Sequence, residues 1–343
     1  MHGVVCLNFG VYGFGSIGRL IARVALERGF SLVGVVDIDP SIVGRDAGEV
    51  LGLGERLGVR VSSDVSSLRG SDVVFHATGS YLDRVYRQIL GVVDLGSDVI
   101  STCETLAYPY YRYPVLARLL DERARMRGVA ILGSGINPGF LLDTLLVTLS
   151  SSIPVVRRVR AVRSLDAARR REPFRRKIGV GESPEVVEAK LRSGELTGHV
   201  GYAESVLLVA DASGLNLTRV VEEQHPVVAE DDVESHGVIV RRGYNKGIVG
   251  YGSGYVGGKE VIRVELRAYV GAPEYEEVVI EGLDQSITWR SSGTPGDTGT
   301  AAVIVSLAEK LKGYGPGLLT MVDLLPFRPF IKYDVDNPLR APP

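Results

Sequence analysis

The chain of 343 residues contains only two cysteines, Cys6 and Cys103. Because Cys6 falls in an apolar opening segment that predicts a core strand, a disulfide framework is excluded and a reducing compartment is expected. Long apolar runs are also missing: the longest, residues 140–149, contains Asp143 and is too short to cross a bilayer. No targeting signal precedes the first predicted strand. These absences predict a cytoplasmic protein without a membrane partner.

An excess of charge of either sign is lacking as well. The formal net charge is −2, which gives no reason to expect nucleic acid as a partner. Lysine is scarce relative to arginine and amides are few, a composition typical of thermophilic sources. No internal repeat or low-complexity segment is present. A chain of this length is longer than a single hydrophobic core usually supports, so we expect about two domains.

A glycine-rich stretch follows the first predicted strand and leads into an amphipathic helix. Its pattern is Gly13-x-Gly15-x-x-Gly18, and strand, glycine turn and helix in this order are typical of a Rossmann dinucleotide site. Phosphates would lie on the free N–H groups at the helix N-terminus. The motif alone also fits an ordinary glycine turn. The cofactor-binding residues expected here are Gly13, Phe14, Gly15, Ser16, Ile17 and Gly18.

An acidic residue, Asp37, ends the second predicted strand about 20 residues after the glycines, where it can hold the ribose hydroxyls. Its charge should repel a 2′-phosphate, which favours NAD, although Arg19 or Arg45 leaves NADP open. Further residues expected at the cofactor follow later strands. They are Ala77, Thr78, Ser80, Thr102 and Asn137.

Strands and helices alternate over residues 1–145, which predicts a doubly wound parallel sheet. The segment 156–163 alternates like a half-exposed strand, with Arg163 at its end. It opens an α+β domain of largely antiparallel sheet over residues 146–296. We expect Thr78–Ser80 to cap the helix that follows. Residues 297–343 are predicted to form a helix that returns to the Rossmann domain and an extended arm after Pro326.

Glu104 is the first candidate for chemistry because it directly follows a buried strand. A partly desolvated carboxylate there can exchange protons near neutral pH. It can equally cap a turn or pair with an arginine. Cys103 is the competing candidate, as the nucleophile of an aldehyde dehydrogenase, but no histidine lies in a matching motif.

Arg163 is a candidate to bind a substrate carboxylate, and Phe140 is expected beside the substrate. A surface ion pair is the plainer interpretation of Arg163. The basic run 169–177 suggests phosphate binding, but neighbouring acids favour a salt-bridged surface or a subunit contact. The tyrosines of residues 108–113 predict either a pocket wall or a packed turn.

Taken in order, these motifs resemble the 2,4-diaminopentanoate dehydrogenase family, which includes NAD(P)-dependent amine dehydrogenases and is related to dihydrodipicolinate reductase in its cofactor domain. The likeness rests on the glycine turn and on segments 35–46, 76–80, 101–104, 135–140, 169–179, 198–201 and 315–321. The family's catalytic glutamate corresponds to Glu104, and positions around Arg163 shape its substrate pocket.

The resemblance implies a two-domain oxidoreductase that uses NAD or NADP. It would deaminate an amine or diamino acid to a ketone and ammonia, with Glu104 as acid and base, and would run in reverse as reductive amination. A homodimer formed through the sheet of the second domain is expected. Two alternatives remain open: a Cys103-dependent aldehyde dehydrogenase and a non-catalytic protein that senses dinucleotides.

Overall fold

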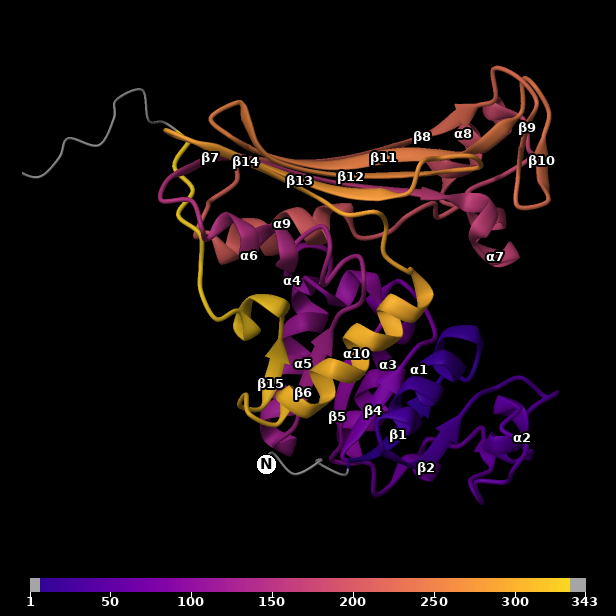
Figure 1. Ribbon diagram of the computed structural model, residues 1–343. Coiled ribbons are helices and arrows are strands. Elements are labelled where there is room, and N and C mark those ends of the chain that lie inside the picture. The colour runs from indigo at the N-terminus through magenta and orange to yellow at the C-terminus, as the bar shows by residue number, and fades with distance from the viewer. Residues whose placement is uncertain (1–6, 334–343) are drawn as a thin grey trace, which may run out of the picture. The chain divides into compact units, whose positions relative to one another are not determined.

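The computed structural model of the chain describes residues 7–333, so Cys6 and the last part of the predicted arm lie outside the described residues. The chain divides into two compact units (Figure 1). The first runs to Phe140 and also contains Pro295–Leu324. The second contains Leu141–Thr294 and the residues from Leu325 onward.

The first unit is built on a parallel sheet of seven strands in the order β15-β6-β5-β4-β1-β2-β3. All its strand pairs are parallel, so the predicted doubly wound sheet is confirmed. The strands are β1 (Asn8–Tyr12), β2 (Ser31–Val36), β3 (Val61–Ser62), β4 (Val73–His76), β5 (Asp98–Ser101), β6 (Ala130–Gly133) and β15 (Gly317–Leu319).

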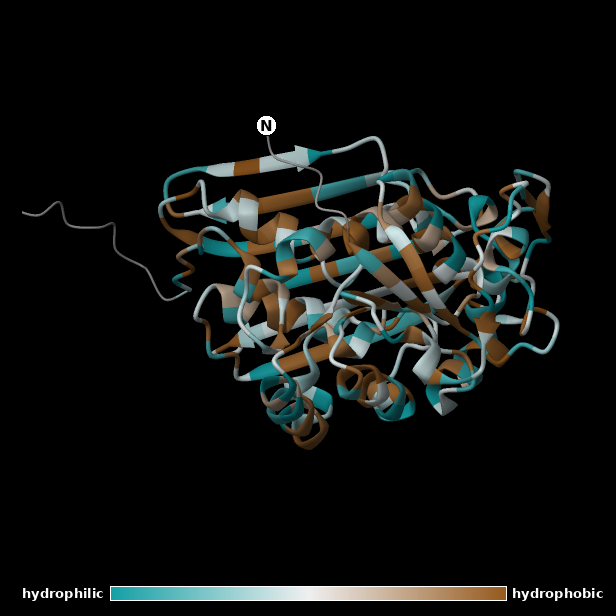
Figure 2. Cartoon of the chain, turned by 90° about the horizontal axis from the view of Figure 1, so that it is seen from below, coloured by the Kyte–Doolittle hydropathy of each residue, from teal (hydrophilic) through white to brown (hydrophobic). Residues whose placement is uncertain are grey.

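Two pairs of helices cover this sheet. Helix α1 (Ser16–Glu27) packs on α10 (Asp297–Leu311), and α3 (Leu82–Asp94) packs on α5 (Pro114–Arg127). The strand order places β2 and β4 on opposite sides of β1, so right-handed crossovers put the two pairs on opposite faces. Figure 2 shows hydrophobic and hydrophilic residues mixed along the helices, as expected for helices buried on one side.

Helix α3 illustrates why these segments form. Its buried residues Leu82, Val85, Ile89 and Val92 recur at helical spacing and face the core. Burying each such side chain stabilises the fold by about 1.5–3 kcal/mol. The shorter helical elements of the unit are α2 (Ala47–Leu51), η1 (Val65–Leu68), η2 (Glu104–Leu106), α4 (Pro109–Arg112) and η4 (Met321–Leu324).

The second unit carries a six-stranded sheet in the order β14-β13-β7-β12-β11-β8. Its pairs are antiparallel except for β7 with β12, which confirms the predicted largely antiparallel sheet. The strands are β7 (Val156–Asp166), β8 (Arg219–Val228), β11 (Asn245–Val256), β12 (Lys259–Tyr269), β13 (Tyr275–Gly282) and β14 (Ser286–Arg290). A separate hairpin joins β9 (Val233–Ser235) to β10 (Val238–Val240).

Helices α6 (Thr144–Ser150) and α9 (Tyr202–Ala212) pack on one face of this sheet (Figure 1). Asp143 in the apolar run 140–149 is fully buried, where it accepts hydrogen bonds from Thr144 N and the Ser205 hydroxyl. The remaining helices are η3 (Ala167–Arg169), α7 (Glu172–Lys177) and α8 (Pro184–Ser193). Across residues 7–333, the structure shows no helix with the length and apolar character needed to span a membrane.

Two local predictions were wrong. Strand β7 alternates in exposure over its first residues as expected, but it continues to Asp166, so Arg163 lies inside the strand and is buried. Its arginines fit there because glutamates on β12 and β13 pair with them. Thr78–Ser80 do not cap α3 either. Tyr81 occupies the N-cap position without a side-chain hydrogen bond, and the Leu82 N–H donates instead to Thr105 Oγ1 at 2.9 Å.

Candidate functional site

A single row of residues crosses the first sheet at the carboxyl ends of its strands. Strand register aligns Val36, Tyr12, His76, Ser101 and Gly133, each of them the last residue of its strand. Residues that follow this row therefore lie along one edge of the sheet. In open α/β sheets this edge binds the ligand, near the point where strand order reverses. Here the reversal lies between β1 and β4.

Backbone hydrogen bonds also join the residue that follows a strand end to the last residue of the neighbouring strand. Gly13 N donates to Val36 O at 2.8 Å, Ala77 N to Tyr12 O at 2.8 Å, and Thr102 N to His76 O at 3.0 Å. The structure thus places the predicted residues Gly13, Ala77 and Thr102 side by side. Asp37, Thr78 and Asn137 follow β2, β4 and β6 at the same edge.

The glycine turn has the form that the sequence predicts. Gly13 has a φ of +93°, which disfavours other residues. A Cβ on Gly18 would lie 1.8 Å from Gly13 O, so only glycine lets helix and turn close up. A Cβ on Gly15 would meet nothing within 4 Å. Gly15 is the N-cap of α1 and no side chain caps it, so open space faces the helix N-terminus. This cradle fits the phosphates of a dinucleotide.

Asp37 is half-buried at the end of β2 and is fixed by backbone hydrogen bonds. Its Oδ2 accepts from Phe14 N and its Oδ1 from Asp39 N at 2.9 Å. The carboxylate is thus tied to the glycine turn itself. Arg19 Nε donates to Phe14 O at 2.9 Å, so this arginine holds the same turn, while Arg45 is exposed.

Glu104 is the first residue of η2, three residues after the end of β5, and its side chain is half-buried. Neither plainer interpretation applies. Cys103 occupies the N-cap of η2 without a side-chain cap, and among residues 7–333 the Glu104 carboxylate has no hydrogen-bond or ion-pair partner. Its neighbour Thr105 anchors the segment by donating to Ser80 O. A carboxylate held without a protein partner is suited to exchange protons with a ligand.

Cys103 has the opposite properties. Its side chain is 1% exposed, and burial together with the adjacent Glu104 charge raises the pKa of its thiol to about 12. A nucleophilic cysteine needs a thiolate in an electropositive, partly exposed environment. The position of Cys103 therefore favours packing over covalent chemistry.

We expect Cys103→Ser to keep kcat within about threefold of the unmodified enzyme, because the thiol serves only packing. Iodoacetamide should leave the unmodified enzyme active over the same incubation. Steady-state assays after gel filtration measure both results. Loss of activity in the variant together with rapid alkylation of Cys103, located by mass spectrometry, would favour the aldehyde dehydrogenase alternative.

In the second unit, Arg163 is 3% exposed and has protein partners. Its Nε lies 3.5 Å from Glu276 Oε1, and its Nη2 donates to Thr294 O at 2.9 Å. A substrate carboxylate would have to share this guanidinium with Glu276, so binding by Arg163 stays a prediction. Phe140 ends the first unit and is half-buried.

The basic run 169–177 is largely engaged with its surroundings. Arg169 pairs with Glu274, Arg175 donates to Arg170 O, and Arg176 pairs with Glu172. This arrangement fits the predicted salt-bridged surface. The tyrosine run forms the short helix α4 and its flanks, with Tyr110 and Tyr111 exposed. The Tyr110 hydroxyl donates to Leu318 O and the Tyr113 hydroxyl to Asp83.

Sequence reasoning passed over His76 because it matched no catalytic motif. The structure places it, fully buried, in the transverse row beside Ser101. A histidine at the end of the apolar segment Val73–Phe75, followed by Thr78, was the available signal.

Comparison with known proteins extends this picture. Residues 140–338 match the family described as the 2,4-diaminopentanoate dehydrogenase C-terminal domain. The chain is 31% identical over 339 residues to the 2,4-diaminopentanoate dehydrogenase of Acetoanaerobium sticklandii, covering 92% of each. It is 33% identical over 161 residues to an amine dehydrogenase of Streptomyces virginiae, covering 43% of each.

Among solved structures, an amine dehydrogenase from Mycobacterium smegmatis is similar with a TM-score of 0.78 and 22% identity, over 92% of this chain and 95% of that one. Biliverdin reductase from Synechocystis is similar with a TM-score of 0.54 and 13% identity, over 92% and 93%. At these identities the two structures support the fold alone.

Proposed function

This chain belongs to the 2,4-diaminopentanoate dehydrogenase family, and from that premise we propose that it is an amine dehydrogenase in which Glu104 moves the protons. It is an oxidoreductase that uses a nicotinamide cofactor. The proposed reaction converts an amine or diamino acid to a ketone and ammonia, and runs in reverse as reductive amination. The observation that carries the proposal is the half-buried Glu104 carboxylate, which has no hydrogen-bond or ion-pair partner among residues 7–333, at the edge where such sheets bind ligands.

The cofactor would be held by the two groups of residues that the sheet edge brings together. The glycine turn with Asp37 would hold the pyrophosphate and ribose, and the loops after β4, β5 and β6 would line the remainder. These loops contribute Ala77, Thr78, Ser80, Thr102 and Asn137. When bound, the nicotinamide would supply or accept the hydride at its C4.

Glu104 has three tasks in the reductive direction. Its carboxylate takes a proton from ammonium, so that ammonia can attack the carbonyl carbon and form a carbinolamine. The protonated acid then returns the proton to the carbinolamine hydroxyl, which leaves as water. The carboxylate regenerated in this step stabilises the positive iminium. Holding the reacting groups in place can supply roughly 7–11 kcal/mol of the barrier.

The deciding experiment measures oxidation of NADH and NADPH with a panel of small ketones and aldehydes, each with and without ammonium. Amine dehydrogenase chemistry requires ammonium. Consumption without ammonium would instead indicate a carbonyl reductase. If neither occurs, the oxidative assay with diamino acids and simple amines follows, and inactivity there would leave a dinucleotide sensor. Comparing carbonyls with and without a carboxylate tests whether Arg163 binds that group.

Asp37 should set the choice of cofactor, and we propose a preference for NAD. A fixed carboxylate at the end of β2 repels the 2′-phosphate of NADP. In Asp37→Ser we expect the ratio of kcat/KM for NADH to that for NADPH to fall by about tenfold or more. Initial rates at varied cofactor concentration measure it. An unchanged ratio would show that another group discriminates, and Arg45→Ala tests that group next.

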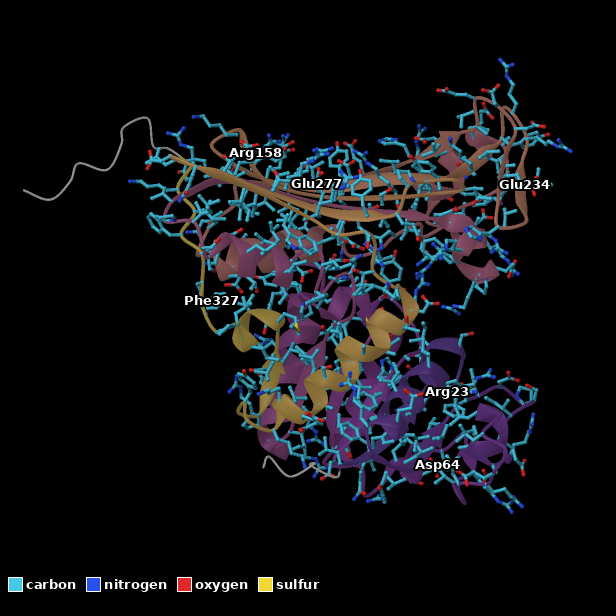
Figure 3. All side chains as sticks on the ribbon, in the orientation of Figure 1. Arg23, Asp64, Arg158, Glu234, Glu277 and Phe327 are labelled. Carbon is cyan, nitrogen blue, oxygen red and sulfur yellow. The ribbon has the colours of Figure 1, made fainter. Side chains whose placement is uncertain are left out.

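A homodimer would form through the face of the six-stranded sheet away from α6 and α9. Register places Arg158 and Arg160 of β7 on this face with Glu265 of β12 and Glu277 of β13. The side chains of Arg158 and Glu277 can be followed on the sheet in Figure 3. Because the face carries both signs, it is complementary to a second copy turned by a two-fold axis.

We expect light scattering after gel filtration to give about twice the chain mass of 37.0 kDa. The double reversal Arg158→Glu with Arg160→Glu should shift the mass toward the monomer, since it places like charges across the axis. A dimer that persists unchanged in this variant would place the interface elsewhere.

A further inference from the structure

A series of buried hydrogen bonds joins β4 to β5 and reaches the backbone next to Glu104. His76, the last residue of β4, is 0% exposed. Its Nδ1 lies 2.7 Å from the hydroxyl of Ser101, the last residue of β5. The Ser101 Oγ in turn accepts a hydrogen bond from Cys103 N at 3.1 Å. Cys103 is the N-cap of the short helix whose first residue is Glu104.

The other ring nitrogen determines the direction of these hydrogen bonds. His76 Nε2 lies 2.9 Å from Gln88 Oε1 and 2.9 Å from the Thr78 hydroxyl. Gln88 Oε1 can only accept, and the Thr78 hydroxyl donates its one proton to that oxygen, so neither neighbour gives a proton to Nε2. Nε2 therefore carries the proton, and Nδ1 accepts from the Ser101 hydroxyl. Ser101 Oγ is thereby left with a lone pair for Cys103 N. Hydrogen bonds aligned in this way polarise one another in a buried site.

This chain of bonds requires a neutral imidazole. A protonated ring would present a second donor to Ser101 and would turn the serine hydroxyl away. Burial lowers the pKa of His76 to about 4, so the ring is neutral in the pH range in which Glu104 would work. The ring is also 5.6 Å from that of Tyr12 at the end of β1, so its position is set from both neighbouring strands.

We propose that His76 is a positioning residue for the reaction: through the Ser101 hydroxyl it fixes the backbone turn that carries Glu104, and through Gln88 and Thr78 it fixes the loop after β4. The inference rests on the proposed role of Glu104 and adds the device that holds this carboxylate. Thr78 contacts the cofactor turn as well, because a Cβ on Gly13 would lie 2.7 Å from its Cγ2.

Two amide replacements of His76 distinguish its hydrogen bond to Ser101 from its hydrogen bond to Gln88. The amide of an asparagine can reach the place of Nδ1, whereas the longer glutamine side chain reaches the place of Nε2. His76→Asn thus keeps an acceptor for Ser101 and loses Gln88. His76→Gln keeps the partner of Gln88 and loses the contact with Ser101. The two variants have the same amide group and differ only in which neighbour they reach.

We expect His76→Gln to lower kcat by about 10–100-fold, because a displacement near 1 Å at a catalytic group costs up to about 10²-fold. The KM of the carbonyl substrate and the Kd of NADH, from fluorescence titration, should change little. His76→Asn keeps the link to Ser101 but releases the loop after β4, so its effect should appear as a higher Kd of NADH and a smaller loss of kcat than in His76→Gln. Ser101→Ala removes the same link directly and should match His76→Gln, which keeps the test decisive if one histidine variant does not fold.

A double-variant cycle distinguishes positioning from general stability. If His76 acts through Glu104, then His76→Gln should not further lower the residual rate of Glu104→Gln. Equal losses in His76→Asn and His76→Gln, or a further loss of the same size on the Glu104→Gln background, would overturn the inference. Full activity in Glu104→Gln alone would instead overturn the proposed function, so the two failures are distinguishable.

Discussion

Glu104→Gln is expected to lower kcat by about 10²–10⁴ while NADH binds as before. The amide occupies the same space but can neither take the proton from ammonium nor stabilise the iminium by its charge. Reductive amination of the best carbonyl substrate under saturating ammonium measures kcat, and fluorescence titration measures the Kd of NADH. Since Glu104 has no protein partner within the described residues, the substitution breaks no internal contact, and its thermal stability should be unchanged.

Glu104→Asp serves as the matched control. It keeps the carboxylate but withdraws it by one methylene, so the loss of kcat should lie between that of glutamine and the unmodified enzyme. Glu122→Gln on the exposed surface of α5 should have no effect on kcat. Near-normal turnover in Glu104→Gln would remove this residue from the mechanism.

The second large effect is a contrast between two glycines three residues apart. Gly15 has φ −71° and ψ −162°, which other residues also adopt, and a Cβ there meets only open space. Gly15→Val should therefore keep the melting temperature of the cofactor-free protein but raise the Kd of NADH by about 100-fold or more, which corresponds to about 2.7 kcal/mol. The side chain would fill the place expected for the pyrophosphate.

Gly18→Ala should mainly lower the stability of the cofactor-free protein rather than its affinity for NADH. Its Cβ would stand 1.8 Å from Gly13 O, so the turn and α1 must move apart. Overpacking of this kind typically costs about 1–3 kcal/mol of unfolding free energy. Differential scanning fluorimetry with and without NADH separates the two variants. If Gly15→Val binds NADH normally, the cofactor does not approach the turn at Gly15.

Much of the fold follows from local patterns. The helix predicted from residue 297 is present as α10, which begins at Asp297. The order of strand, glycine turn and helix predicted the parallel sheet. These signals are local, since each depends on residues within about one turn or strand of one another.

Contacts between distant segments could not be predicted in the same way. The interior position of Arg163 depends on Glu276, more than 100 residues away, which pairs with it in the neighbouring strand. The cap expected from Thr78–Ser80 is replaced by Thr105 from the next loop. His76 likewise gains its significance only from its register with Ser101. A single sequence, taken without an alignment, contains no signal for such pairings.

Because Pro295–Leu324 belong to the first unit, this unit cannot finish folding early while the nascent chain is being synthesised on the ribosome. Its sheet has β15 as an edge strand, and α1 packs on α10. Both β15 and α10 are synthesised only after Leu141–Thr294, the larger part of the second unit. Until then the nascent chain presents the open edge of β6 and the uncovered side of α1, features that favour association with other chains. The first unit is therefore completed only after most of the second unit has been synthesised.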